Sequence, residues 1–180
     1  KPGGHGALWK LALDTGAMAW LKGQGRTKAL VRQINNPVAG TDYGLCAFTG
    51  KGFKENKAFG FSSCYRAVGS AEGVNVIREH KEEDIYTYAL TNIEYTDFTK
   101  KGVVDAPMPG TEYSRFPSNT NILFADLETV KEQAEKNPLP GMLVNMKTEV
   151  VFHDENGGKV KCKGGRLEST MQNIADSILE

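Results

Sequence analysis

Lys28-Ala29-Leu30-Val31-Arg32-Gln33-Ile34 is a short, apolar-rich run that predicts the first strand of a sheet. It leads into the turn-forming Asn35-Asn36-Pro37, because proline disfavours helical geometry in the residue before it. Helical patterns flank the run, at residues 7–16 and 17–23 before it and at 42–52 after it. Helix and strand therefore alternate from the beginning of the chain, which is typical of an α/β protein.

The remainder of the chain continues this alternation. Strand patterns cover residues 59–66, 74–77, 86–95, 122–124 and 143–146, and further helices are expected at 127–134 and 167–178. Residues 149–153 and 159–163, joined by Glu155-Asn156-Gly157-Gly158, predict a hairpin. A hairpin argues against a wholly parallel sheet, so we predict a mixed, mostly parallel sheet flanked by helices.

Several helix details also follow from the sequence. Leu8, Leu11 and Ala12 form one stripe of the first helix. Thr41 or Asp42 can cap the helix whose Leu45 and Phe48 face inward, and residues 50–52 are expected to end it. Residues 100–118 contain three prolines and little periodicity, which predicts a long loop bordering a site.

Composition limits the class of protein. The 180 residues carry 22 basic and 22 acidic side chains, so no overall positive charge favours nucleic acid or an anionic membrane. No apolar run approaches the roughly 18 residues that a membrane-spanning helix needs. Cys46, Cys64 and Cys162 form no Cys-x-x-Cys or Cys/His cluster, which favours a reducing compartment over disulfides or zinc.

Several catalytic motifs are missing from the sequence. It contains no G-x-S-x-G, H-E-x-x-H, Walker or G-x-G-x-x-G pattern. Serine hydrolysis, zinc proteolysis, P-loop chemistry and the usual dinucleotide sites therefore have no support.

A glycine-rich turn, Pro2-Gly3-Gly4-His5-Gly6, runs directly into the first helix. Glycine has no Cβ, so main-chain N–H groups here could approach a base or a phosphate, and the helix start adds a partial positive charge. The alternative is an ordinary surface turn and helix cap.

Polar residues occur where predicted strands begin or end: Asn35-Asn36, Glu94 and Asn119-Thr120-Asn121. In open α/β sheets ligands bind at strand ends, and amides together with a carboxylate suit a hydroxylated ligand such as a sugar. Asparagine also favours turns for local reasons, so each pair alone could be structural.

Lys147 follows the apolar run 143–146 and places an ammonium group at a strand terminus. A solvated lysine is the alternative, because lysine is nearly always exposed. Arg66 at a strand end, Arg166 at an expected helix start and Glu72 are equally ambiguous, and no role is assigned to His80 or His153.

Six segments taken in order resemble the UDP-sugar pyrophosphorylase family, and most closely its plastid type associated with sulfolipid synthesis. They are Lys1 to Gly6, Asn35-Asn36 with Asp42, Glu94-Tyr95, Asn119 to Asn121, Val144-Asn145-Met146-Lys147 and Gly165 to Met171. The resemblance covers nearly the whole chain. It implies a nucleotide-diphospho-sugar transferase (GT-A-like) fold, here incomplete.

The resemblance also implies roles for individual residues. Gly4, His5 and Gly6 would lie against the uridine of the nucleotide. Asn36, Glu94, Asn119 and Asn121 would hold glucose hydroxyls. Lys147 matches the lysine of the family's Val-Asn-Pro-Lys pattern and would be the catalytic residue. Met146 stands in place of that proline, and Ala7 in place of the aspartate that follows Gly-His-Gly in many cytosolic relatives.

We therefore expect residues 1–180 to be the C-terminal portion of a uridylyltransferase catalytic domain that forms UDP-glucose and pyrophosphate from UTP and glucose 1-phosphate. The resemblance implies Mg²⁺ as cofactor, no metal ligand in this chain, and a plastid stroma location, with the cytoplasm otherwise. The family's glycine-rich triphosphate loop is absent and is expected upstream of Lys1. The identity of the sugar and the oligomeric state stay open.

Two other functions remain possible from the sequence. The first is a sugar-nucleotide or carbohydrate-binding module that kept the polar pocket without catalysis. The second is a glycosyltransferase of similar fold, which is expected to show an Asp-x-Asp metal motif, and the sequence has none.

Overall fold

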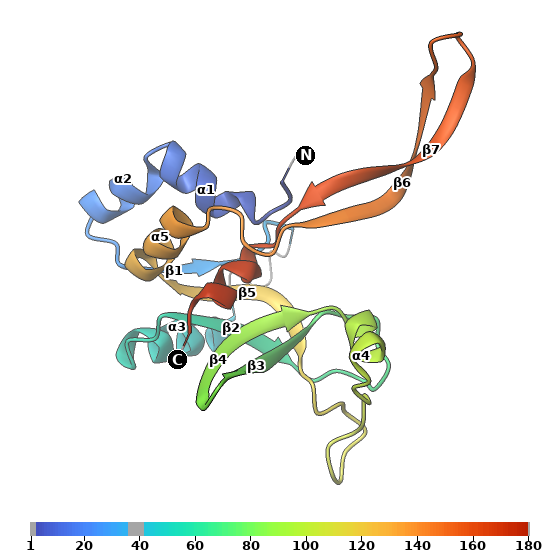
Figure 1. Cartoon of the computed structure of the whole chain (residues 1–180). Helices are drawn as coiled ribbons and strands as arrows, with labels where there is room; N and C mark the ends of the chain where they lie inside the picture. The colour runs from blue at the N-terminus through green and yellow to red at the C-terminus, as the bar shows by residue number, and fades with distance from the viewer. Residues whose placement is uncertain (1–2, 36–41, 180) are drawn as a thin grey trace.

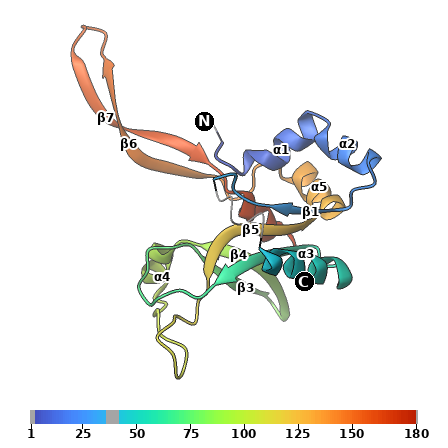
Figure 2. The same cartoon turned by 180° about the vertical axis from the view of Figure 1, so that it is seen from behind.

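The computed structural model describes residues 3–35 and 42–179. A five-stranded sheet with helices on both faces forms the body, and a two-stranded ribbon extends from it (Figures 1 and 2). The helices are α1 (Ala7–Asp14), α2 (Ala17–Gly23), α3 (Tyr43–Lys54), α4 (Tyr95–Lys101), α5 (Leu127–Lys136) and the 3-10 helix η2 (Met171–Ser177). The strands are β1 (Lys28–Val31), β2 (Phe59–Cys64), β3 (Val74–Glu82), β4 (Ile85–Ile93), β5 (Ser118–Asp126), β6 (Leu143–His153) and β7 (Lys159–Glu168).

Every strand pair in the described residues is antiparallel, so the prediction of a mostly parallel sheet is wrong. Lys28 of β1 pairs with Asp126 of β5, and Phe59 of β2 pairs with Ala125 of the same strand. Strands β1 and β2 thus run in the same direction and α3 connects them, as the alternation predicts. However, β5 lies between them in the opposite direction, and periodicity within a strand does not specify its neighbour.

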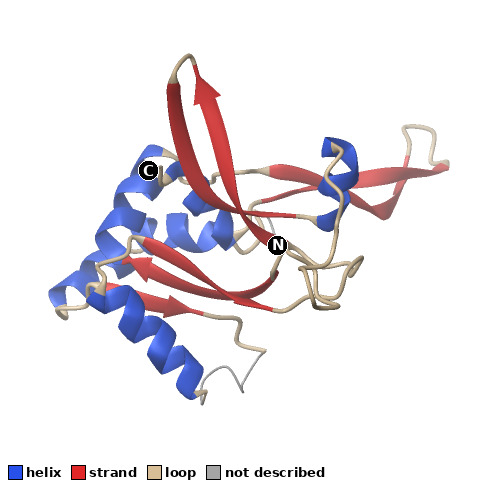
Figure 3. Cartoon of the chain, turned by 90° about the horizontal axis from the view of Figure 1, so that it is seen from below, coloured by secondary structure: helices blue, strands red, loops and turns tan. Residues whose placement is uncertain are grey.

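The two faces of β5 build two clusters of apolar side chains. Leu123 and Ala125 pack with Trp9, Val130 and Ile174 beneath α1, α5 and η2. The alternate residues of β5 face α3 on the other side, where Ile122 packs with Leu45. Successive side chains of a strand point to opposite faces, so one strand supports both layers. Figure 3 shows the sheet between these helical layers.

Helix α3 runs to Lys54, whereas the sequence predicted its end at residues 50–52. At Gly52 a Cβ would lie 2.7 Å from Cε2 of Phe124, so glycine here permits close contact between helix and sheet. The predicted start of α3 is confirmed, because the Asp42 side chain accepts a hydrogen bond of 2.8 Å from the N–H of Gly44.

The stripe of the first helix faces the core only in part, through Ala12. Leu8 and Leu11 are 41% and 57% exposed, whereas Trp9 is 3% exposed and belongs to the core. The indole Nε1 of Trp9 donates a buried hydrogen bond of 2.8 Å to the carbonyl of Met171. The largest side chain thus determines which face of this two-turn helix is buried.

The predicted hairpin is confirmed and is longer than expected. Strands β6 and β7 pair along their whole length, from Leu143 opposite Glu168 to His153 opposite Lys159. Arg166, predicted at a helix start, lies within β7 and pairs with Asn145. The C-terminal segment then forms the 3-10 helix η2 rather than the α-helix predicted from residue 167. No helix in the described residues has the length and apolar character that crossing a bilayer requires.

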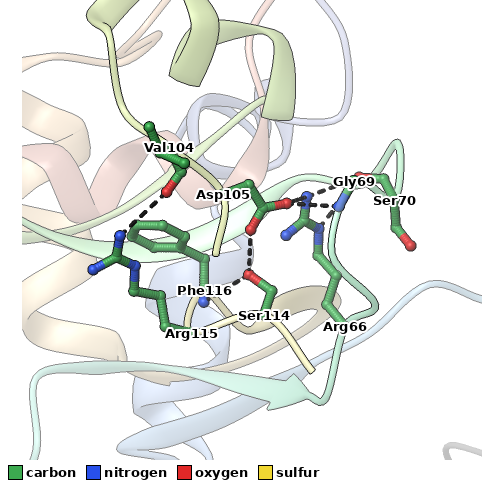
Figure 4. Close-up of polar contacts among 8 residues, drawn as sticks. All are labelled: Arg66, Gly69, Ser70, Val104, Asp105, Ser114, Arg115 and Phe116. Atoms are coloured by element: carbon green, nitrogen blue, oxygen red, sulfur yellow. Dashed lines mark hydrogen bonds and ion pairs between the residues drawn. The ribbon is translucent and has the colours of Figure 1, made fainter. Parts of the chain in front are cut away.

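Arg66, which sequence alone left ambiguous, anchors the long loop before β5 (Figure 4). Its side chain is 1% exposed, and Nη2 lies 2.8 Å from the Asp105 carboxylate and 2.9 Å from the carbonyl of Ser70. The N–H of Gly69 and the hydroxyl of Ser114 donate to the same carboxylate at 2.7 and 2.5 Å. Burial alone would raise the pKa of Asp105, but these hydrogen bonds and the guanidinium charge lower it to about 2.

Candidate functional site

The glycine turn lies directly against the chain that leaves β7. The N–H of Gly3 donates to Leu167 at 3.2 Å, and the N–H of Ser169 donates to Gly3 at 2.9 Å. The N–H of Gly6 donates to the carbonyl of Ser169 at 2.7 Å. The lack of Cβ atoms in these glycines therefore allows the turn to pack closely against residues 167–169. Among described acceptors, none receives the N–H groups of Gly4 and His5, so these remain available to a ligand.

We predict that Gly6→Ala destabilises the folded protein by about 1–3 kcal/mol. A Cβ at Gly6 would lie 2.7 Å from the carbonyl carbon of Ser169 and from the carbonyl oxygen of Thr170, and backbone atoms cannot move aside cheaply. Gly50→Ala in α3 is the matched control, because its Cβ meets nothing within 4 Å and alanine favours a helix. Thermal unfolding measures both. Equal stability of the two variants would contradict the close packing of the turn.

His5 is held in one tautomer. Its Nδ1 accepts a hydrogen bond of 3.0 Å from the backbone N–H of Met171, so the neutral ring carries its proton on Nε2. Partial burial lowers the pKa of His5 below 6.5, although the Glu168 carboxylate opposes that shift. His5 is therefore a neutral side chain that can offer Nε2–H as a donor.

Asn119 and Asn121 lie inside β5, at an irregular point of the ladder with β2, rather than before a strand as predicted. Asn121 has φ +58°, a left-handed conformation that asparagine tolerates better than most residues. Bulges in a strand redirect side chains and often occur beside active sites. The hydroxyl of Thr120 donates to the carbonyl of Ser62 at 2.6 Å, which fixes the bulge to β2.

The hydrogen bonds orient both amides. Oδ1 of Asn119 accepts from the backbone N–H of Asn121 at 3.0 Å. Nδ2 of Asn119 donates to Oδ1 of Asn121 at 3.0 Å. Nε2 of Gln172 donates to the same Oδ1, which occupies its second lone pair. No described acceptor receives the Nδ2 group of Asn121. The amide pair therefore presents N–H donors, which suit hydroxyl or phosphoryl oxygens of a ligand.

Helix η2 brings the two polar segments together. Met171 contacts His5 through its N–H, and the next residue, Gln172, contacts Asn121 through its side chain. Sequence reasoning missed Gln172. The sequence carries no clear signal for it, because polar Asn173 follows directly, and only the structure shows Gln172 2% exposed beside buried Met171 and Ile174.

Glu94 follows β4 directly, as predicted. Strand pairing places Ile93 opposite Val74, and Val74 opposite Ser118, so the chain positions next to Glu94 and Asn119 lie in one row across three strands. Two strand spacings separate the ends of that row, roughly 10 Å. Glu94 is exposed, and its carbonyl accepts from Asp97 at 2.9 Å at the start of α4.

A set of hydrogen-bonded polar side chains, of which Asn75 is buried, supports this end of the sheet, and the sequence did not single it out. Nδ2 of Asn75 donates to Oγ of Ser63 at 2.7 Å, and Nδ2 of Asn92 donates to Oδ1 of Asn75 at 3.2 Å. Ser63 pairs with Asn119 across the ladder. These bonds connect β2, β3 and β4 beside the asparagine bulge.

Two predicted site residues are placed only in part. Lys147 belongs to β6, where the pairing with β7 shifts register between Asn145 and Thr148, and its side chain is not described. Asn36 lies outside the described residues. The roles proposed for both remain predictions.

The described residues contain no group of three or more histidine, cysteine, aspartate or glutamate side chains that could hold a metal ion. Mg²⁺ usually takes one or two carboxylates, several waters and substrate phosphates rather than an all-protein cage.

No protein-family model matches the chain. It is 44% identical over 183 residues to UTP–glucose-1-phosphate uridylyltransferase 3, chloroplastic, of Arabidopsis thaliana, which covers 99% of this chain and 21% of that protein. The chain therefore spans about a fifth of the curated relative that it matches. The resemblance found in the sequence is confirmed.

Solved structures show the same fold. A protein assigned as a UDP-N-acetylglucosamine pyrophosphorylase from Entamoeba histolytica superposes with a TM-score of 0.68 at 16% identity, over 97% of this chain and 41% of that chain. A mutant of UDP-glucose pyrophosphorylase from Leishmania major gives a TM-score of 0.63 at 22% identity, over 97% of this chain and 36% of that chain. A second mutant of the same enzyme, solved with UDP-glucose, gives a TM-score of 0.59 at 20% identity, over 98% of this chain and 36% of that chain.

Proposed function

We propose, from its similarity to the chloroplastic uridylyltransferase, that this chain is the C-terminal portion of a catalytic domain that makes UDP-glucose. The reaction joins UTP and glucose 1-phosphate and releases pyrophosphate. A plastid location accompanies the proposal, because the matching relative is chloroplastic.

The observation that carries the proposal is the meeting of His5 and Asn121 at η2. The family resemblance implies that the first residue contacts the nucleotide and the second the sugar. A shared support holds these two segments near each other, as a ligand with joined nucleotide and sugar halves requires.

The nucleotide side of the proposed site has specific donors. Gly6 uses its N–H for Ser169, so the N–H groups of Gly4 and His5 and the Nε2–H of His5 remain to contact uridine. Gly6 contributes by allowing the turn to pack, which holds those donors in place.

The sugar side combines opposite hydrogen-bonding roles. Asn119 and Asn121 supply N–H donors to hydroxyl oxygens, and the Glu94 carboxylate accepts from hydroxyl groups. Asn36 is proposed as a further contact. Because each sugar hydroxyl both donates and accepts, a set of donors with one acceptor group can fix its orientation.

Lys147 is proposed as the catalytic residue. The phosphate of glucose 1-phosphate is already an anionic nucleophile, so its in-line attack on the α-phosphorus of UTP needs no general base. The reaction needs alignment of two anions and neutralisation of their charge, which one ammonium group can supply. Met146 in place of the family's proline leaves the lysine itself unchanged.

Mg²⁺ is proposed to enter with the phosphates of UTP, where it would neutralise charge on the nucleotide. No residue of this chain is assigned to hold it. The glycine-rich triphosphate loop is likewise proposed to lie in the part of the protein before Lys1.

The experiment that tests the function uses the full-length protein that carries this chain. Purified protein with UTP, glucose 1-phosphate and Mg²⁺ is expected to release pyrophosphate and to form UDP-glucose, and to run the reverse reaction when pyrophosphate is added. The 180-residue chain alone is expected to show little or no turnover. Binding of UDP-glucose without turnover by the full-length protein would favour the alternative, a sugar-nucleotide-binding module.

A further inference from the structure

We propose that Gln172 is a positioning residue that orients Asn121 toward the sugar. The inference rests on the proposed function and concerns the sugar side of that site. Gln172 touches no ligand in this proposal and acts only through the amide of Asn121.

The hydrogen bonds define how Gln172 acts. Oδ1 of Asn121 accepts from Asn119 and from Gln172, so both lone pairs are occupied and the Nδ2 group is left to donate elsewhere. Without Gln172, a flip of the Asn121 amide would break one side-chain hydrogen bond instead of two. The flipped amide would present an acceptor where the bound sugar oxygen requires a donor.

The burial of Gln172 shows that its amide is costly to the fold. The side chain is 2% exposed, and its Oε1 has no hydrogen-bond partner among the described residues. An unpaired buried carbonyl destabilises a folded protein, so an apolar side chain of similar length should be tolerated at this position. A buried polar side chain that does not stabilise the fold indicates a role in function.

The nucleotide side should not depend on this side chain. The contacts of the neighbouring Met171, to His5 and from Trp9, are made by main-chain N–H and carbonyl groups. A substitution at position 172 that preserves the backbone therefore leaves them intact. This separates an effect on the sugar from an effect on the nucleotide.

The test compares Gln172→Met with wild type in the full-length protein. Isothermal titration measures affinity for UDP-glucose and for UDP, and thermal unfolding measures stability. We expect UDP-glucose affinity to fall five- to tenfold, as for one lost neutral hydrogen bond. UDP affinity should stay within twofold, and Tm should be unchanged or higher. Gln24→Met, the same chemical change at an exposed residue, should match wild type.

Other outcomes separate the possible failures. Unchanged UDP-glucose affinity in Gln172→Met overturns the positioning role. So does a lower Tm with parallel loss of both ligands, which would make Gln172 structural; Gln172→Leu repeats the test so that a misfit of methionine is not mistaken for this result. Wild-type protein that binds neither UDP-glucose nor UDP would instead overturn the proposed function.

Discussion

Replacing Lys147 with alanine in the full-length protein is expected to lower kcat for UDP-glucose formation by roughly two to three orders of magnitude. The physical reason is that a charge contact that strengthens on a transferring phosphoryl group is worth several kcal/mol in the transition state. The measurement is steady-state release of pyrophosphate at saturating UTP and glucose 1-phosphate.

Lys159→Ala is the matched control for this substitution. Lys159 is an exposed lysine at the far end of the same ribbon, where it pairs with His153. It should retain wild-type turnover. If Lys147→Ala lowered only affinity for the sugar nucleotide and left kcat intact, the lysine would be a binding contact and the binding-module reading would gain support.

Replacing Asp105 with alanine is expected to lower the free energy of unfolding by about 3 kcal/mol or more, because it leaves the buried Arg66 guanidinium without its anion. One nitrogen of that guanidinium, Nη1, already lacks a partner among the described residues. Chemical denaturation measures the loss, and hydrogen exchange should show it first in residues 66–70 and 103–116. Arg115→Ala, an exposed arginine in the same loop, should change stability by less than about 1 kcal/mol.

The same ion pair predicts how stability depends on pH. The pKa of Asp105 falls from 3.8 to about 2 on folding, so in that interval the unfolded chain binds more protons than the folded one. The stabilisation is therefore complete above about pH 4 and is lost as the pH falls toward 2. Asp105→Asn should flatten this part of the acid unfolding curve. A curve identical to wild type would show that the carboxylate is not held by Arg66.

Local features were predicted well because their causes are local. The side chain of Asp42 caps α3, as the sequence indicated, since a cap needs only a side-chain oxygen and an N–H two residues on. The hairpin formed by β6 and β7 was also predicted from its turn residues. Boundaries set by packing were missed, such as the passage of α3 through Gly52 against Phe124.

The candidate site shows the same division between local motifs, which the sequence revealed, and contacts between distant residues, which it did not. The glycine–histidine turn and the Asn119–Asn121 segment stood out as short motifs, and the sequence also gave Glu94 its place after a strand. Gln172 did not stand out, because its role depends on a contact with Asn121 that lies 51 residues away in the chain. The direction in which each amide points was equally hidden, since it depends on which donors surround Oδ1.

By itself, the sequence determined most of the helices and strands in order, although not α4, together with the cap of α3, the turn of the hairpin and the family that the chain resembles. These depend on side-chain chemistry within a few residues, and on motifs in a fixed order. Only the tertiary structure decided that β5 separates β1 from β2, and that η2 joins His5 to Asn121. Strand neighbours and shared supports arise from packing between distant segments, which a periodic pattern of apolar residues leaves unspecified.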